Sequence, residues 1–263
     1  MMEWPVFAYL PAYNVQASAA ELVARMAAAR KKLAAHGFTL RQMLFVDDGS
    51  KDMTANRIAS LASKHKFVRL IRVKKNRGAM NALLIGMRSS VAAAKKAGLP
   101  LERCIFVRLD SDLEHQPEDL KRLLLPISSG KSKLSVGYIP FDSRSGRAIC
   151  EFNRKIGLEE SRRFLGVPVP QFCPGFNAIR GDLFVRLAPL MGKKAVSFLR
   201  AFGKGMLTID IIILASAKKM GAAPTVVRLR KIESKWLKKP DQKKIASYLE
   251  YHNMTVKFLR RQL

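Results

Sequence analysis

The sequence has few cysteines, few acidic residues and no long uninterrupted hydrophobic stretch. Its three cysteines, Cys104, Cys150 and Cys173, are widely spaced and none forms a C-x-x-C pair, so we expect no zinc site and a reducing compartment. The longest apolar stretch, Met206–Ala217, contains Asp210 and is shorter than the about 20 residues that a membrane-spanning helix needs. No basic segment leads into an apolar one near residue 1, so no secretory signal is expected.

The scarcity of acidic residues leaves the chain strongly basic. The 263 residues include 48 Lys and Arg against 20 Asp and Glu, a formal net charge of +28. Residues 1–120 carry 19 basic and 11 acidic residues, whereas residues 121–263 carry 29 and 9. This excess predicts a polyanionic partner: phosphates, anionic lipid or nucleic acid. A basic nucleic-acid-binding protein therefore stays an alternative, although no nucleic-acid-binding module is evident.

The length and the 48% hydrophobic content favour one α/β domain, which we place at residues 1–240. Segments typical of strands alternate with helical ones, which predicts a mostly parallel sheet with helices on both faces. Strands are expected at Val6–Leu10, Met43–Val46, Phe67–Val73, Cys104–Leu109, Leu134–Ile139 and Pro224–Leu229. Helices are expected at Glu21–Ala35, Thr54–Ser63, Ala79–Ala97, Pro117–Leu125, Asp182–Leu190, Ala195–Phe202 and Ile209–Met220, with Ser18 and Glu21 in a capping box, and also around Glu151–Phe164 and over Asp241–Leu263.

Two acidic clusters follow expected strands, at the position where open α/β sheets place their ligand sites. In Asp110-Ser111-Asp112 the two carboxylates can reach one hard cation, and Glu114 continues the spacing as a third oxygen ligand. These three residues are candidate ligands of Mg²⁺ or Mn²⁺. The competing interpretation of such a pattern is a solvated loop or a helix cap.

The second cluster, Asp47-Asp48-Gly49-Ser50, combines carboxylates with a glycine that permits a tight turn. A carboxylate there can accept a hydrogen bond from a ribose hydroxyl or a base N–H; alternatively, Asp48 and Asp52 cap the helix that follows. Two further segments end strands: residues 11–14 after the first, and residues 76–78 after the third. Glycine and arginine at a helix N-terminus are typical of an anion site.

Taken in order, residues 10–14, 46–52, 76–78 and 110–112 resemble the nucleotide-sugar glycosyltransferases of family 2, which have the GT-A fold. Residues 112–117 resemble the metal loop of the branch that includes dolichyl-phosphate mannosyltransferase and other polyprenyl-phosphate glycosyltransferases. Residues 174–180 and 230–235, the pair Arg154-Lys155, and Asp210 resemble that branch's acceptor region. Val15 stands where the branch usually has Glu. The resemblance covers about residues 6–235.

The resemblance implies an inverting, metal-dependent hexosyltransferase that moves a sugar such as mannose or glucose from a nucleoside diphosphate to a polyprenyl phosphate. Residues 1–120 would form the donor half and residues 121–240 the acceptor half, at the cytosolic face of a membrane. The implied roles are donor binding by Pro11, Tyr13, Asp47, Asp48, Asn76, Gly78 and Asp110; catalysis by Asp110, Asp112 and Asp210; metal binding by Asp110, Asp112 and Glu114; and acceptor binding by Arg154, Lys155, Arg230, Lys231, Ser234 and Lys235.

The nature of the acceptor decides which groups the site needs. A hydroxyl acceptor, the enzymatic alternative, requires a carboxylate base. A monophosphate has a second pKa of about 6 and is already ionised at neutral pH, so it requires cations instead. Asp210 would act as the base for a hydroxyl acceptor, or it would orient a basic residue or cap a helix.

The C-terminal segment offers one route to a membrane that would carry such an acceptor. Basic residues flank an apolar series at helical spacing, which favours either interfacial binding, on its own or through a membrane-anchored partner, or packing on the core. The apolar residues of this series are Ile245, Leu249, Val256, Leu259 and Leu263.

Overall fold

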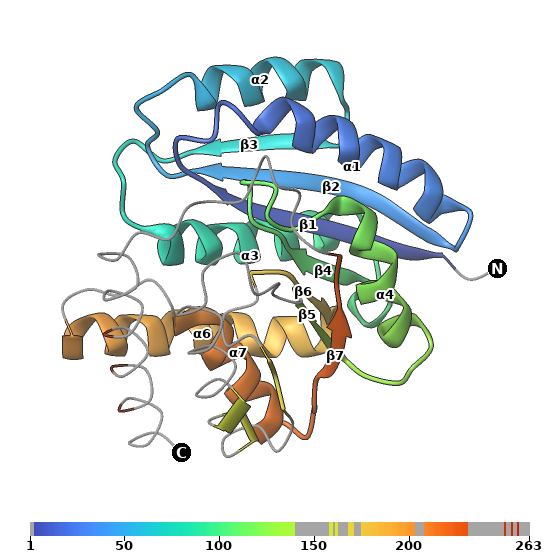
Figure 1. Cartoon of the computed structure of the whole chain (residues 1–263), viewed down its shortest axis with the longest axis vertical. Helices are drawn as coiled ribbons and strands as arrows, with labels where there is room; N and C mark the ends of the chain where they lie inside the picture. The colour runs from blue at the N-terminus through green and yellow to red at the C-terminus, as the bar shows by residue number, and fades with distance from the viewer. Residues whose placement is uncertain are drawn as a thin grey trace.

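A seven-stranded sheet, with strand order β3-β2-β1-β4-β6-β5-β7, organises the computed structural model of the chain (Figure 1). The structure describes residues 3–139, 158–159, 161–162, 168–170, 175–202 and 208–230, and residues 250, 254 and 257. The strands are β1 (Trp4–Ala12), β2 (Phe38–Asp47), β3 (Val68–Arg72), β4 (Ile105–Arg108), β5 (Leu134–Tyr138), β6 (Asn177–Arg180) and β7 (Thr225–Arg228). The helices are α1 (Ala19–Ala34), α2 (Thr54–Lys64), α3 (Ala79–Lys96), α4 (Leu120–Ser128), α6 (Gly181–Phe202) and α7 (Thr208–Lys219), with short 3-10 turns η1 (Leu101–Arg103) and η2 (Pro117–Asp119).

The pairing confirms the predicted mostly parallel sheet and adds one antiparallel strand. β1 pairs in parallel with β2 and β4, and β2 pairs in parallel with β3. β6 runs antiparallel between β4 and β5, and β5 pairs in parallel with β7. We did not predict β6, because its four residues become a strand only through neighbours on both sides that are distant in sequence.

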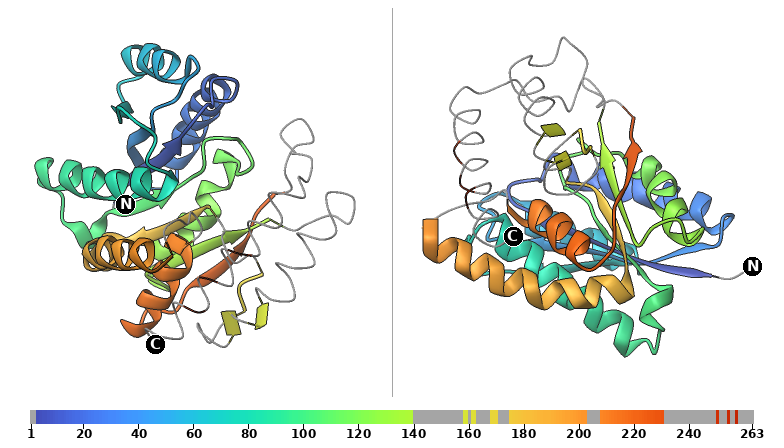
Figure 2. Two further views of the ribbon diagram at one scale, coloured as in Figure 1. Left: turned by 90° about the vertical axis from the view of Figure 1, so that its left-hand side faces the viewer. Right: turned by 90° about the horizontal axis from the view of Figure 1, so that it is seen from below.

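Alternation along β1 divides the core into two layers. Val6, Ala8 and Leu10 face a core with α1 and α4, whereas Phe7 and Tyr9 face a core with α3, α6 and α7. This is the two-residue period of a strand that is buried on both faces. Figure 2 shows the two groups of helices on opposite sides of the sheet. The predicted helices on both faces are therefore confirmed.

Three predictions about local structure were wrong. β2 extends back to Phe38 because its first residues pair with the start of β1. Ser18 makes no capping bond at α1; its hydroxyl donates instead to the Ser111 carbonyl oxygen, 2.7 Å away. α6 is one helix where we expected two, although it contains Pro189. An internal proline costs a helix about 3 kcal/mol, which burial of Phe184, Leu187 and neighbouring apolar residues offsets.

The remaining predictions concern segments that the structure describes only in part. Two helices are expected around Glu151–Phe164 and over Asp241–Leu263, and most residues of each lie outside the described part of the chain. Met254 packs against the core that contains α6 and α7. Among the described residues, no helix is long and apolar enough to cross a membrane.

Candidate active site

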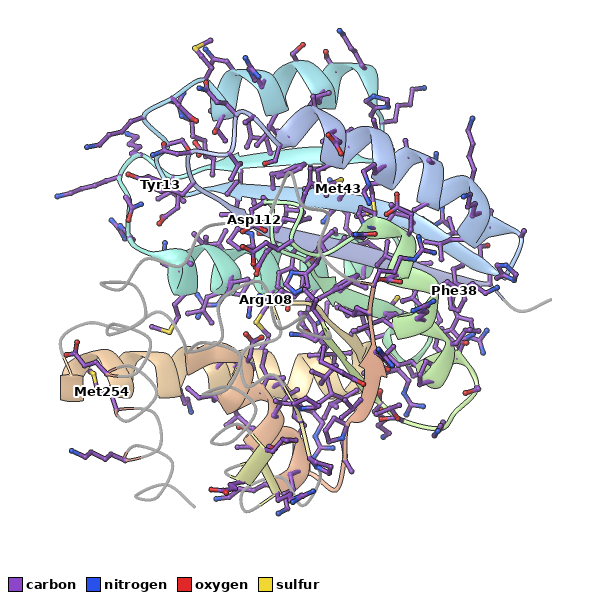
Figure 3. All side chains as sticks on the ribbon, in the orientation of Figure 1. Tyr13, Phe38, Met43, Arg108, Asp112 and Met254 are labelled. Carbon is purple, nitrogen blue, oxygen red and sulfur yellow. The ribbon has the colours of Figure 1, made fainter. Side chains whose placement is uncertain are left out.

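The two acidic clusters lie at the same edge of the sheet, on either side of β1. Ala12 at the end of β1 is opposite Asp47 of β2, and Tyr9 is opposite Arg108 of β4. Two strand spacings separate the clusters, which corresponds to about 10 Å. Figure 3 shows Tyr13, Asp112 and Arg108 toward this end of the strands. The predicted convergence of the motifs at the carboxyl edge of the sheet is therefore present in the structure.

Asp48 holds the loop that leads into α3. The residue is 2% exposed, and its carboxylate accepts hydrogen bonds from the backbone N–H of Arg77, at 3.0 and 3.2 Å, and of Gly78, at 2.7 Å. The start of α2 is bonded by Asp52, whose carboxylate accepts the Thr54 N–H at 3.0 Å. The capping alternative thus applies to Asp52 and not to Asp48.

Asp47 is fully buried and closes the turn that follows β2. Its Oδ1 accepts the Ser50 N–H at 3.2 Å, and its Oδ2 lies 3.7 Å from Arg72 Nε. Gly49 has φ +71°, and a Cβ at this position would lie 2.7 Å from the Asn76 nitrogen. Only glycine fits this contact, so the loops after β2 and β3 are packed directly against each other.

The loop after β1 joins the same assembly. Asn14, at φ 53°, donates its N–H to Ser50 Oγ, and its side-chain oxygen accepts the Lys51 N–H, both at 3.0 Å. Tyr13 is 42% exposed. Segments after three different strands are therefore fixed to one another, and an aromatic ring stands exposed on them.

Ser111, the middle residue of the second cluster, anchors that cluster. Its hydroxyl donates to the Pro11 carbonyl oxygen at 2.7 Å, while its own carbonyl oxygen accepts the Ser18 hydroxyl. Leu113 is fully buried with φ 65°, a left-handed conformation that is costly for a leucine. This turn directs the backbone so that Asp112 Oδ1 accepts the Glu114 N–H at 3.2 Å. The serine and the leucine fix the backbone, and the carboxylates on either side are left partly exposed.

A buried arginine lies between the second cluster and Asp210 on α7. Arg108 Nη2 is 3.3 Å from Asp110 Oδ1, and Nη1 pairs with Asp210 Oδ2. The other Asp210 oxygen accepts the Asn177 side-chain N–H at 3.1 Å. Burial lowers the pKa of Arg108, but Asp210 and then Asp110 more than offset this and raise it. The guanidinium therefore stays charged, and both Asp210 oxygens are engaged by protein groups.

His115 completes the surroundings of Asp110. Its Nδ1 lies 4.0 Å from Asp110 Oδ2, and both ring nitrogens are buried without a hydrogen-bond partner. Burial lowers the pKa of His115 and raises that of Asp110, although Arg108 acts against the latter shift. The Gly175 backbone lies directly against the same carboxylate, since a Cβ at this position would lie 2.2 Å from Asp110 Oδ2.

The groups around Asp110 are of the kinds that a divalent cation binds. The Asp110 carboxylate is partly exposed and lies near Asp112 and near the His115 imidazole, whose ring nitrogens have no hydrogen-bond partner. Neutral imidazole is a common metal ligand. In the part of the chain that the structure describes, no three His, Cys, Asp or Glu side chains are grouped closely enough to hold a metal alone. A cation here would complete its shell with oxygens of a bound ligand, as Mg²⁺ usually does.

Of the six residues expected to bind an acceptor, the structure describes Arg230. Its N–H donates to Asp119 Oδ2 at 2.7 Å, and its Nε lies 3.4 Å from the other Asp119 oxygen. The side chain is 49% exposed, on the side of the sheet that carries α4. Arg154, Lys155, Lys231, Ser234 and Lys235 lie outside the described residues.

Sequence reasoning assigned no role to several residues that build this site. Arg108 had a detectable signal, because it is a charged residue inside the apolar run 104–109. His115 stood within a quoted motif without a role of its own. Ser18 was predicted only to cap a helix, and Ser111 and Asn177 stood within quoted motifs without a role of their own. Their contacts gave no signal, since their partners are distant in sequence.

Comparisons with known proteins show which family and which proteins this chain is similar to. The model of the family described as Glycosyl transferase family 2 matches residues 8–187. An undecaprenyl-phosphate 4-deoxy-4-formamido-L-arabinose transferase of Shewanella sediminis is 30% identical over 172 residues, covering 65% of this chain and 46% of the relative. A dolichol-phosphate mannosyltransferase of Pyrococcus furiosus is 29% identical over 128 residues, covering 49% and 31%. The chain thus spans less than half the length of these curated relatives.

Solved structures support the fold. Glucosyl-3-phosphoglycerate synthase of Mycobacterium tuberculosis, in complex with Mn²⁺, UDP-glucose and phosphoglyceric acid, aligns with a TM-score of 0.63 at 19% identity, covering 97% of this chain and 79% of that one. Mannosyl-3-phosphoglycerate synthase of Rubrobacter xylanophilus aligns with a TM-score of 0.63 at 15% identity, covering 99% and 74%. Both confirm the predicted GT-A fold.

Proposed function

This chain belongs to glycosyl transferase family 2, and we propose that it transfers a hexose from a nucleoside-diphosphate sugar to a polyprenyl phosphate, with inversion at the anomeric carbon. The relatives named above act, by their names, on undecaprenyl phosphate and dolichol phosphate. The observation that carries the choice of acceptor is the engagement of Asp210 by Arg108 and Asn177. The sequence alternative of a non-enzymatic nucleic-acid-binding protein does not agree with this family membership.

The donor half of the proposal rests on the second acidic cluster. Asp110 and Asp112 would hold Mg²⁺ or Mn²⁺ together with oxygens of the bound diphosphate, with His115 beside them. Glu114 stays the third predicted ligand, since the described residues bring no three such side chains close enough together. The bound cation would neutralise the leaving diphosphate as the glycosidic C–O bond breaks. Asp48 orders Arg77 and Gly78 through their backbone N–H groups, and the turn that Asp47 closes lies beside them. The nucleotide would lie along this edge, against Pro11, Tyr13 and Asn76.

The acceptor half rests on the role given to Asp210. With one oxygen on Arg108 and the other on Asn177, this carboxylate is suited to orient the guanidinium toward Asp110, as one of the sequence alternatives held. We therefore treat Asp210 as a positioning residue. An acceptor that arrives ionised needs no base: its phosphate oxygen forms the bond to the anomeric carbon, and the electron pair of the broken bond leaves on the nucleoside diphosphate. Arg230 and the predicted acceptor residues at 154, 155, 231, 234 and 235 would bind that phosphate.

Transfer assays with matched acceptors test this proposal. The purified chain is incubated with Mn²⁺ and radiolabelled GDP-mannose or UDP-glucose, and with either a polyprenyl phosphate or the polyprenol of the same length. We expect labelled lipid only with the phosphate. Equal labelling of the alcohol would favour the hydroxyl-acceptor alternative. A chain that labels soluble hydroxyl acceptors but no lipid phosphate would contradict the proposal.

A further inference from the structure

Three loops at the carboxyl edge of β1, β2 and β3 form one exposed shelf, which we call the donor-side ledge: residues 13–17, 48–53 and 72–77. Besides the bonds of Asn14 to the second loop, the Met53 N–H donates to Gln16 Oε1 at 3.1 Å. Asp48 bonds the second loop to the third, and Gly49 is in backbone contact with it. The ledge is therefore a defined surface and not three independent loops.

The ledge concentrates positive charge. Its exposed cations are Lys51, Arg72, Lys74, Lys75 and Arg77, whereas its acids, Asp48 and Asp52, are buried or half-buried and bonded to backbone N–H groups. Residues 51–100 carry 12 Lys and Arg against one Asp; the rest of residues 1–120 carry seven basic and ten acidic residues. The basic excess of the donor half is thus local to the ledge and the helices that adjoin it.

The ledge also exposes apolar side chains. The exposed large hydrophobic residues of the described part are Tyr13 at 42%, Met53 at 52% and Leu125 at 44%. Two of these three belong to the ledge. Met53 stands among its cations and carries the apolar contribution to docking, whereas Tyr13 is the residue against which the nucleotide would lie. Apolar and aromatic side chains beside lysine and arginine are the combination that binds the interface of an anionic bilayer. A single exposed aromatic is too few for the stacking platform of a single-stranded nucleic-acid site.

We propose that the donor-side ledge docks on an anionic membrane surface. The inference rests on the proposed function, because a polyprenyl phosphate resides in a bilayer. The ledge lies at the same sheet edge as Asp110 and Asp112, so docking there would bring that edge to the lipid headgroups. The surface differs from the C-terminal segment that the sequence suggested, and the two could act together.

Vesicle sedimentation with matched charge reversals tests the ledge. The variant Lys74→Glu with Lys75→Glu changes the ledge. The control, Lys95→Glu with Lys96→Glu, makes the same change of charge at the end of α3, which lies at the opposite edge of the sheet. Each cation near an anionic bilayer strengthens partitioning about fivefold, so loss of two lysines alone weakens binding to phosphatidylglycerol vesicles ~30-fold, and the two added carboxylates should make the ledge variant weaker still. The control should bind within about threefold of wild type, and neither protein should bind pure phosphatidylcholine vesicles strongly.

The apolar contribution is tested by Met53→Ser, with Leu125→Ser as the control of similar exposure on α4. Weaker vesicle binding by Met53→Ser alone would support docking through the ledge. Equal losses in both charge-reversed variants, or no binding of wild type to anionic vesicles, would overturn it. Loss of oligonucleotide binding by the ledge variant, with vesicle binding retained, would also overturn it in favour of nucleic acid.

Turnover separates this inference from the proposed function. At saturating donor and with a short-chain, water-soluble polyprenyl phosphate, the kcat of the ledge variant should match that of wild type, because no bilayer is involved. With the acceptor in anionic vesicles, its rate should fall in proportion to its binding. Absence of turnover in wild type with either acceptor would contradict the proposed function, while the sedimentation result would still decide the ledge. Equal rates of wild type and ledge variant on vesicles would overturn docking alone.

Discussion

Asp48 and Asp110 both follow a parallel strand and both belong to a pair of acids, yet the structure uses their carboxylates differently. Asp48 is 2% exposed and is bonded to two backbone N–H groups. The Asp110 side chain is 31% exposed and faces Arg108 and His115. The first carboxylate holds the protein's own backbone, whereas the second is open to a ligand. The difference in exposure leaves Asp110, and not Asp48, accessible to a ligand.

The largest effect on sugar transfer should come from the second acidic cluster, residues 110–112, which we call the open cluster. Replacing Asp112→Ala should reduce sugar transfer at least ~10³-fold, because a group at the developing charge of the leaving diphosphate is lost. Since Asp112 is partly exposed, the free energy of unfolding should change by less than about 1 kcal/mol. Steady-state transfer rates and urea denaturation measure the two quantities. Unchanged turnover would remove Asp112 from the proposed ligand set.

Arg108 links the open cluster to α7, and its removal should be the most destabilising change. Arg108→Leu leaves Asp210 buried without its cation, at a cost of about 3–5 kcal/mol in the free energy of unfolding. Replacing both partners, Arg108→Leu with Asp210→Leu, should restore most of that loss, because no uncompensated charge stays buried. If the double variant unfolds as easily as the single one, the ion pair is not the cause.

Replacing Asp48, in the first acidic cluster (residues 47–50), should lower stability more than it lowers kcat, which is the reverse of the pattern expected for Asp112→Ala. Asp48→Ala leaves backbone N–H groups without a partner and should cost about 1–3 kcal/mol of stability. Because residues 76–78 loosen, the KM for the donor should rise more than kcat falls. Urea denaturation and donor titrations give these values. A loss of kcat like that of Asp112→Ala, with stability unchanged, would abolish the distinction between the clusters.

The smallest effect concerns the anchor of the open cluster. Ser111→Ala removes the hydroxyl that bonds the Pro11 carbonyl oxygen and should cost about 1 kcal/mol. Transfer should fall only modestly, since the carboxylates remain. Stability can be compared with that of Ser63→Ala, whose exposed hydroxyl bonds a carbonyl within α2. Equal stability of the two variants would show that the anchor adds nothing.

The sequence predicted the parts of this fold that local patterns encode. The carboxyl ends of β2 and β4 were predicted to within one residue because apolar runs stop near Asp47 and Asp110, and α3 was predicted from Gly78 ahead of an apolar series. β6 and the pairing of Asp210 with Arg108 and Asn177 could not be predicted, because each exists only through partners distant in sequence. The same reason explains why Asp48 and Asp110 looked alike: the backbone that engages Asp48 belongs to another loop.

The rate of transfer to a polyprenyl phosphate as a function of pH, in wild type and in Asp210→Asn, tests most directly whether an ionised phosphate is the acceptor. Circular dichroism first establishes that the variant is folded. If the phosphate attacks as an oxyanion and Asp210 only positions Arg108, both proteins should lose activity below about pH 6, where the acceptor binds a proton, and the variant should keep the shape of the profile. An acid limb that disappears in a folded Asp210→Asn, together with nearly all turnover, would identify Asp210 as the base and contradict this assignment.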